Sequence, residues 1–188
     1  MADNQNTDYS KKILLHACCG ICSGYPISYL IDNGYQVTVY FTNDNLDTLA
    51  EYQRRLDAES TLCKYFDVPL IIQSYNHSKY TDYVKGLEQE KEGGKRCLKC
   101  FELRFRDTAQ KALELDIKTI TTSMIISPHK NFKALSEIGK TAADEYNLNF
   151  LAIDFKKKDG FLKTNRIAKQ LQLYRQNYCG CEYAKGKG

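Results

Sequence analysis

The stretch Lys12–Ser23, KILLHACCGICS, decides the fold of this chain. Its first part, Lys12–Cys18, is short and mostly apolar, which predicts a strand buried on both faces of a parallel sheet. A helix is predicted over residues 23–32, with Pro26 tolerated in its first turn and Gly34 just beyond its end. A buried strand that runs straight into a helix favours an α/β fold.

Strands and helices alternate along the rest of the chain. The further strands are expected at residues 35–42, 68–73, 118–123 and 149–155, and the further helices at residues 47–67, 97–116, 131–146 and 164–174. Pro69 places the third strand at a sheet edge, and residues 75–96 are expected to form a mobile helical excursion or lid. The expected architecture is therefore α/β, a single-domain, Rossmann-like parallel sheet with helices on both faces.

The domain is expected to span residues 12–183, between a disordered N-terminal tail at 1–11 and a C-terminal tail at 184–188. In such a sheet, ligands bind outside the carboxyl ends of the strands. The polar and sulfur-bearing residues that follow the predicted strands would all meet at this edge. The edge is where a metal site is expected.

The composition excludes several classes of protein. The chain has 188 residues, 43% hydrophobic and 27% charged, without an apolar run long enough for a membrane span and with a polar N-terminal segment unlike a secretory signal. A cytoplasmic location is expected, and the eight cysteines are therefore expected to bind metal or carry out redox chemistry. The net charge is +4, but residues 151–188 hold nine basic and three acidic residues. Charge alone favours a solvated surface over a polyanion-binding one.

Seven of the cysteines are clustered, and they stand in three short motifs. The motifs are Cys18-Cys19-x-x-Cys22, Cys97-x-x-Cys100 and Cys179-Gly180-Cys181. At a helix start the CxxC spacing puts both sulfurs on one face, where the helix N-terminus is expected to lower the thiol pKa values. Cys63 stands alone among apolar residues of a helix and is expected in the core.

The number of clustered thiols limits which metal groups they can bind. A structural zinc site and a cubane iron–sulfur cluster each take four ligands, so seven exceed either need by three. One iron–sulfur cluster with three further thiols fits better than two zinc sites, and the three could ligate a second iron or include a redox-active pair. A Cys179–Cys181 disulfide would close a small, strained ring of the labile kind. A thioredoxin-like dithiol enzyme would explain only one CxxC motif.

Several longer strings extend this pattern along the chain. They are HACCGICS (16–23), EYQRR (51–55), RCLKC (96–100), TTSMIISPHKN (121–131), IGKTAA (138–143), DFKKKDG (154–160) and LYRQNYCGC (173–181). In this order, from His16 to Cys181, they resemble the cobalamin-independent epoxyqueuosine reductase (QueH) family. That resemblance implies an adenine-nucleotide-hydrolase-like fold and an oxidoreductase that converts epoxyqueuosine to queuosine at the wobble position of tRNA, removing the epoxide oxygen as water with two electrons.

The resemblance also implies roles for the cysteines. It assigns Cys18, Cys19, Cys97 and Cys100 to a [4Fe-4S] cluster, and Cys179 and Cys181 to a redox-active pair. Cys22 is then expected to ligate iron, either in the cluster or in an additional mononuclear iron beside it. The catalytic set is Cys22, Cys179 and Cys181, and an electron-donor protein or reductant is the implied partner.

Other residues are candidates for contacts with the tRNA. Asn43 and Asn45 follow the second predicted strand, where a diol or ribose can bind; a plain turn and helix cap is nearly as good an interpretation. Aromatic and guanidinium planes for an unstacked base are offered by Tyr174, Arg175 and Tyr178, and backbone contacts by Lys156 and Lys158.

Two rival functions remain for this sequence. A zinc-stabilised RNA-binding module would be colourless and indifferent to oxygen, whereas an iron–sulfur enzyme is brown. An ATP-dependent tRNA thiolase needs a glycine- and serine-rich phosphate loop after the first strand, and this chain has Cys18-Cys19-Gly20 there.

Overall fold

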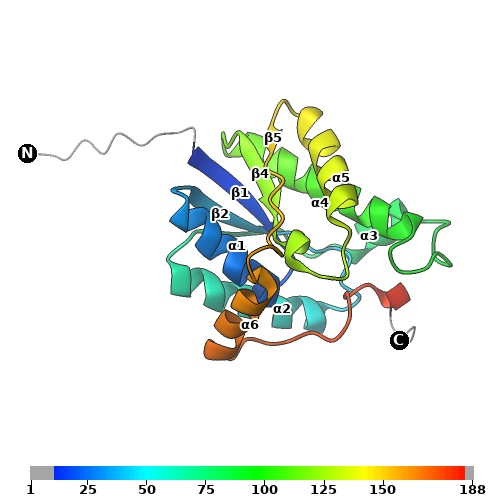
Figure 1. Ribbon diagram of the computed structural model, residues 1–188. Helices are drawn as coiled ribbons and strands as arrows, with labels where there is room; N and C mark the ends of the chain where they lie inside the picture. Colours follow the sequence, from blue (N-terminus) through cyan, green and yellow to red (C-terminus); the bar gives the residue numbers. More distant parts are fainter. Residues whose placement is uncertain (1–10, 185–188) are drawn as a thin grey trace, which may run out of the picture.

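The computed structural model describes residues 11–184, which fold around one sheet of five parallel strands in the order β3-β2-β1-β4-β5 (Figure 1). The strands are β1 (Lys12–Ala17), β2 (Gln36–Phe41), β3 (Leu70–Ile72), β4 (Thr119–Thr122) and β5 (Asn149–Phe150). β1 pairs in parallel with both β2 and β4 and so lies at the centre. The parallel α/β sheet predicted from the sequence is confirmed, with β3 at the edge that Pro69 indicates.

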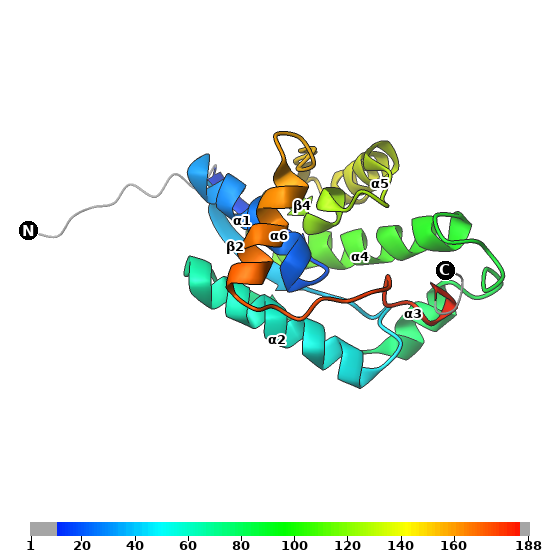
Figure 2. The ribbon, with the colours of Figure 1, turned by 60° about the horizontal axis from the view of Figure 1, so that its bottom comes forward.

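Helices cover both faces of this sheet (Figure 2). They are α1 (Gly20–Asp32), α2 (Leu49–Phe66), α3 (His77–Tyr83), α4 (Lys95–Glu114), α5 (Phe132–Asp144) and α6 (Gly160–Gln170), with the short 3-10 helices η2 (Ser123–Ile126) and η3 (Glu182–Ala184). α1 packs against α2 and α6, and α4 packs against α5. None of the helices in the described part of the chain is long and apolar enough to cross a membrane.

Alternation along β1 explains the two layers. Ile13 and Leu15 join a core cluster that includes Leu62 of α2, whereas Leu14 joins a cluster with Ala112 of α4 and Ala143 of α5. Successive side chains of a strand point to opposite faces, so a continuous apolar run is buried on both sides.

Several element boundaries differ from those predicted. α1 begins at Gly20, three residues before the predicted start, so Pro26 lies inside the helix and not in its first turn. β5 ends at Phe150 and leaves Asp154 in the irregular segment that follows it, and α6 ends at Gln170, four residues before the predicted end. As a result, residues 172–181 are an extended segment that Figure 2 shows running from α6 past α2 to α3, and we call it the C-terminal strap.

Residues 75–96 contain α3 and are packed onto the domain. Tyr80 and Val84 are buried in a cluster with Leu103 of α4, and Lys79 forms an ion pair of 2.6 Å with Asp107. The predicted tails lie outside the described residues, except for Lys11 and Ala184, and Ala184 belongs to η3.

Candidate metal centre

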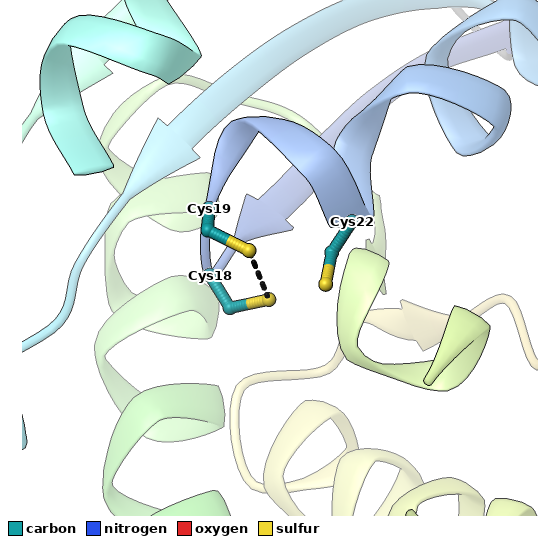
Figure 3. Close-up of side chains that lie close together, drawn as sticks. All are labelled: Cys18, Cys19 and Cys22. Atoms are coloured by element: carbon teal, nitrogen blue, oxygen red, sulfur yellow. Dashed lines mark hydrogen bonds between the residues drawn. The ribbon is translucent and has the colours of Figure 1, made fainter. Parts of the chain in front are cut away.

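Three thiols meet where β1 ends and α1 begins. The sulfur atoms of Cys18, Cys19 and Cys22 lie within 4.8 Å of one another, and the first two are 3.8 Å apart. Figure 3 shows the Cys22 side chain directed toward the other two from the first turn of α1. We call these residues the thiol triad. Within residues 11–184, no other group of three His, Cys, Asp or Glu donor atoms is as compact.

The local backbone accounts for the arrangement of the triad. Cys19 is the extended N-cap residue of α1, and its side chain caps no backbone N–H. The backbone N–H of Cys18 donates to Ser123 Oγ at 3.2 Å, which ties the end of β1 to the end of β4. Gly20 lets α1 approach α2, since a Cβ there would lie 2.8 Å from the backbone of Ala58.

The three thiols of the triad do not titrate alike. Hydrogen bonds from the thiols of Cys19 and Cys22 hold the pKa of Cys18 well below its ordinary value. The contact with Cys18, with burial, raises the pKa of Cys19, and the contacts with Cys18 and Cys19, with burial, raise the pKa of Cys22. Because the thiolate is the metal-binding form of cysteine, a buried thiolate supported by two thiols is a donor set suited to a thiophilic metal.

The other four clustered cysteines form a second sulfur group. Cys97 and Cys100 lie in the first two turns of α4, and Cys179 and Cys181 lie in the strap. Cys97 packs against the apolar cluster that holds the triad cysteines Cys18 and Cys19, whereas Cys100 and Cys181 share another cluster. All eight cysteines are free thiols, so the Cys179–Cys181 pair is not joined here.

Burial dominates the chemistry of this second group. It raises the pKa of Cys97 and Cys181, and it raises the pKa of Cys100 to about 12. The prediction that the N-terminus of α4 lowers the pKa values of Cys97 and Cys100 is wrong, because desolvation of the thiolate outweighs the helix dipole. Cys63 is 3% exposed in the core, as predicted.

A cavity of about 380 Å³ lies between the triad and the strap. The predicted site residues that line it are Cys18, Cys22, Asn43, Asn45, Arg175, Tyr178 and Cys179. These residues come from β1, α1, the loop after β2 and the strap. The structure therefore brings two of the predicted catalytic thiols and most of the predicted substrate contacts to one cavity.

The remaining predicted substrate residues lie outside that cavity. The Tyr174 hydroxyl donates to Glu51 Oε2 at 2.9 Å, on the flank of α2. Lys156 is turned toward the protein, with Nζ 3.2 Å from the Ile125 carbonyl oxygen and 3.4 Å from a carboxylate oxygen of Asp154. Lys158 is exposed in the turn before α6.

Besides Arg55, which is paired with Glu51, two cations that were not predicted to belong to the metal site line the cavity. Lys130 directs Nζ to within 3.8 Å of Cys179 Sγ, and the sulfurs of Cys179, Cys18 and Cys100 outweigh its burial and raise the pKa of Lys130. Arg104 is 4% exposed and donates to His16 Nε2 and Asn43 Oδ1. Burial and this guanidinium lower the pKa of His16 to about 3, so the imidazole is neutral.

Neither cation has a carboxylate partner within residues 11–184, although both face sulfur atoms. Buried cations without a counter-ion are costly, so the positive charges of Lys130 and Arg104 favour thiolates or another anion in the cavity. Lys130 belongs to the string SPHK, which the sequence analysis did not connect with the cysteines because the contact is made across the fold.

Two amide side chains at the cavity each keep an oxygen without a hydrogen-bond partner among residues 11–184. They are Oδ1 of Asn45, which is 2% exposed, and Oε1 of the half-buried Gln176. The Gln176 amide N–H donates to Cys19 Sγ at 2.7 Å. Buried acceptors of this kind are suited to hydroxyl groups of a bound ligand, since each unpaired oxygen is costly.

The donor set fits a metal–sulfur group better than any other ligand. Soft thiolates select zinc, copper(I) and iron–sulfur clusters, and the uncompensated cations fit a group of net negative charge. A larger groove of about 630 Å³ lies between α4 and α5, but its lining contains no thiol. The sulfur-lined cavity is therefore the candidate site.

Comparisons with known proteins identify relatives of the whole chain. A family model described as epoxyqueuosine reductase QueH matches residues 13–187. A Streptococcus pyogenes protein named epoxyqueuosine reductase QueH is 38% identical over 178 residues, covering 92% of this chain and 69% of the relative. A protein of that name from Staphylococcus epidermidis is 34% identical over 184 residues, covering 94% of this chain and 77% of the relative.

A solved structure shows the same fold at low sequence identity. It is the U34-tRNA thiolase NcsA from Methanococcus maripaludis with its [4Fe-4S] cluster, with a TM-score of 0.58 and 15% identity. The match covers 93% of this chain and 61% of that one, so this chain spans less than two thirds of the thiolase. The Rossmann-like arrangement is thus shared with another protein class.

Proposed function

The chain belongs to the epoxyqueuosine reductase QueH family, and we propose that it reduces epoxyqueuosine to queuosine in tRNA at the sulfur-lined cavity. The chain is accordingly an oxidoreductase. The observation that carries the location is the meeting of the thiol triad, Cys179 and two uncompensated cations around one cavity. In the reaction the epoxide takes up two electrons and two protons, an alkene forms and the oxygen leaves as water.

We assign the iron–sulfur cofactor to the two sulfur groups. Cys18, Cys19, Cys97 and Cys100 are the proposed ligands of a [4Fe-4S] cluster, which would supply electrons one at a time. The closeness of Cys22 to Cys18 and Cys19 supports its role as an iron ligand, in the cluster or in an additional mononuclear iron. Cys179 and Cys181 are proposed as the redox-active pair.

The chain's own polar groups have separate tasks in this cavity. Lys130 and Arg104 supply positive charge where the epoxide oxygen becomes negative, which stabilises charge that develops in the transition state. Asn45 offers its free oxygen to a hydroxyl of the modified base, and Asn43 is held in place by Arg104 and by the Ala17 carbonyl. The walls formed by Ile21 and Phe161 limit access of water to the reacting atoms.

We propose that the tRNA binds across the strap side of the cavity. Arg175 and Tyr178 line it and offer guanidinium and aromatic planes to an unstacked base. Lys158 is placed for a backbone contact, whereas the inward contacts of Lys156 support a structural role for that residue. An electron-donor protein or another reductant must supply the two electrons.

Metal analysis and turnover together test this function. The protein is purified without oxygen, iron, sulfide and zinc are counted per chain, and tRNA carrying epoxyqueuosine is incubated with it and a chemical reductant. We expect about four or five irons with sulfide, and queuosine in the digested tRNA by mass spectrometry. Zinc without sulfide and no queuosine would instead support a zinc-stabilised RNA-binding module.

A matched pair of variants connects the activity to the triad. Cys22→Ser removes one of the three close sulfurs, and Cys63→Ser removes a core sulfur outside both groups. We expect a lower iron content and loss of turnover in the first variant only. Equal iron content and turnover in both variants would contradict the proposed site.

A further inference from the structure

A buried ion pair on α2 borders the cavity through Arg55 and has no role in the chemistry proposed so far. Glu51 and Arg55 come from the string EYQRR, stand one helical turn apart and are 1% and 3% exposed. Arg55 Nε lies 2.7 Å from Glu51 Oε1. Burial of such a pair is costly unless the remaining donors and acceptors are also used.

The remaining groups of this pair bind the strap. Arg55 donates from Nη1 to the Cys179 carbonyl oxygen at 3.0 Å and from Nη2 to the Tyr178 carbonyl oxygen at 3.2 Å. Glu51 Oε2 accepts the hydroxyl of Tyr174 at 2.9 Å. The pair therefore holds the strap at two places, before and at the cysteine motif.

The chain around Gly180 is packed tightly against the pair. Gly180 has a φ of +103° and a Cβ there would overlap the Leu46 side chain and lie 2.9 Å from Arg55 Nη2. The Gly180 carbonyl oxygen accepts the backbone N–H of Asp47 at 2.9 Å. The peptide units on both sides of this glycine are thus fixed by hydrogen bonds to α2 and the loop before it.

This anchoring sends the two strap thiols in different directions. Cys179 lines the cavity, with Sγ 3.8 Å from Lys130 Nζ. Cys181 Sγ lies 2.9 Å from the hydroxyl of Tyr80, in the cluster between α3 and α4. A shift of the strap by about an ångström would change both contacts.

We propose that Glu51 and Arg55 are positioning residues of the reductase, and that they form a clamp that sets where Cys179 stands in the cavity. The proposal rests on the function proposed above. Arg55 suits the task because its planar guanidinium serves three acceptors at once, the carboxylate and two carbonyl oxygens. A lysine at this position has one nitrogen and cannot bridge them.

Three variants test the clamp in the full-length, iron-loaded protein. Arg55→Gln and Arg55→Lys remove the bridge, and Arg54→Gln is the matched control. Arg54 is the neighbouring arginine and also binds Glu51, at 2.8 Å, but its side chain is 56% exposed. It lies over the Tyr174 ring, 5.3 Å from its centroid, and makes no hydrogen bond to the backbone of the strap, so it tests loss of a Glu51 contact without loss of the bridge. Hydrogen exchange of peptides that cover the strap and steady-state kinetics on modified tRNA are measured.

The two readouts have distinct expected results. Exchange in the strap becomes about tenfold faster in both Arg55 variants and is unchanged in β1 and α4. The kcat falls by about 100-fold because Cys179 is misplaced, and KM rises by a smaller factor because the loosened strap also carries Arg175 and Tyr178. Lysine at position 55 does not restore either value, and Arg54→Gln resembles the wild type.

Each outcome decides the proposal. Wild-type exchange and kcat in Arg55→Gln would overturn the clamp, as would full rescue by Arg55→Lys. If the Arg55 variants do not fold, Tyr174→Phe tests the clamp instead, because it removes only the hydrogen bond between Tyr174 and Glu51. Faster exchange in the strap of this variant would support the clamp, and wild-type exchange would overturn it. If the wild-type protein shows no turnover, the proposed function is refuted, but the exchange measurement still tests the clamp.

Discussion

Glu59 is the one carboxyl group of α2 that is fully buried without a cation to pair with. Ser23 Oγ donates to its Oε2 at 3.0 Å, and Oε1 has no partner among the described residues. Burial raises the pKa of Glu59 from 4.5 to about 8. The folded chain therefore keeps a proton on Glu59 at neutral pH that the unfolded chain releases.

This difference makes stability depend on pH at a single residue. The stabilising contribution of the protonated form is complete below pH 4.5 and is lost as the pH rises to about 8, by roughly 1.4 kcal/mol per pH unit. Glu59→Gln removes this dependence. We therefore expect the free energy of unfolding of the variant, relative to that of the wild type, to increase by roughly 2–4 kcal/mol when the pH is raised from about 5 to about 8. Chemical denaturation at both pH values measures it. Glu137→Gln, at an exposed position of α5, is the control, and parallel pH profiles for wild type and Glu59→Gln would contradict the assignment.

Single residues also show where the sequence fails to reveal the site. Cys18, Cys19 and Cys22 are close in sequence, so their spacing alone predicts a common donor set. The sulfur partner of Lys130 is Cys179, which lies 49 residues later in the sequence. The two meet because the loop after η2 packs against the strap. No local pattern records such a contact, because it is created by the packing of two loops.

At the scale of elements, α1 and α2 carry the site together. Gly20 marks their closest approach, and Gly139 plays the same part for α5 against Phe150 of β5. Both glycines leave no room for a side chain, but only the first adjoins the triad. Comparing the two glycines therefore distinguishes a contact that supports only the fold from one that also supports the metal site.

Alanine at each glycine tests this distinction. We expect Gly20→Ala and Gly139→Ala each to lower the free energy of unfolding by about 1–3 kcal/mol through overpacking. Only Gly20→Ala is expected to weaken iron binding as well, by about tenfold or more, because it displaces the start of α1. Denaturation and anaerobic iron titration measure the two effects. Equal iron affinity in both variants would show that the triad tolerates movement of α1.

The elements were predictable in kind and order, and less so at their ends. Apolar alternation and turn residues predict all five parallel strands and the main helices, and hence the edge where the thiols meet. The start of α1 at Gly20 was missed because Pro26 was assigned to a first turn, although a proline inside a helix costs only one backbone hydrogen bond and a local clash. The predicted helix 164–174 matches α6 but extends into residues 172–174 at the start of the strap, whose contacts with α2 are tertiary and leave no periodic pattern.

At the scale of the whole molecule, the fold places the basic C-terminal region at the same edge of the sheet as the cavity. The described part of the basic C-terminal region, residues 151–184, holds seven basic and three acidic residues and includes α6 and the strap, which border the carboxyl edge of the sheet and the cavity. Crossover helices such as α2 run antiparallel to the strands, so the last turn of α2, with Lys64, lies at the opposite edge. In the sequence, this positive charge by itself indicated only a solvated surface. In the fold it lies beside the candidate site of a chain whose family modifies tRNA.

This arrangement predicts how tRNA binding depends on salt. Lys157 and Lys158 are exposed beside the cavity, whereas Lys64 and the exposed Lys118 lie at the amino edge of the sheet. Each phosphate contact contributes about 0.7–0.9 to the slope of log K against log salt, so replacing Lys157 and Lys158 with glutamine should reduce that slope by about 1.5. Replacing Lys64 and Lys118 in the same way should leave it unchanged, because their side chains face away from the bound tRNA. Binding isotherms at several salt concentrations give both slopes. Equal reductions in the two double variants would mean that tRNA covers both edges of the sheet, and no reduction in either would place the tRNA backbone on another surface.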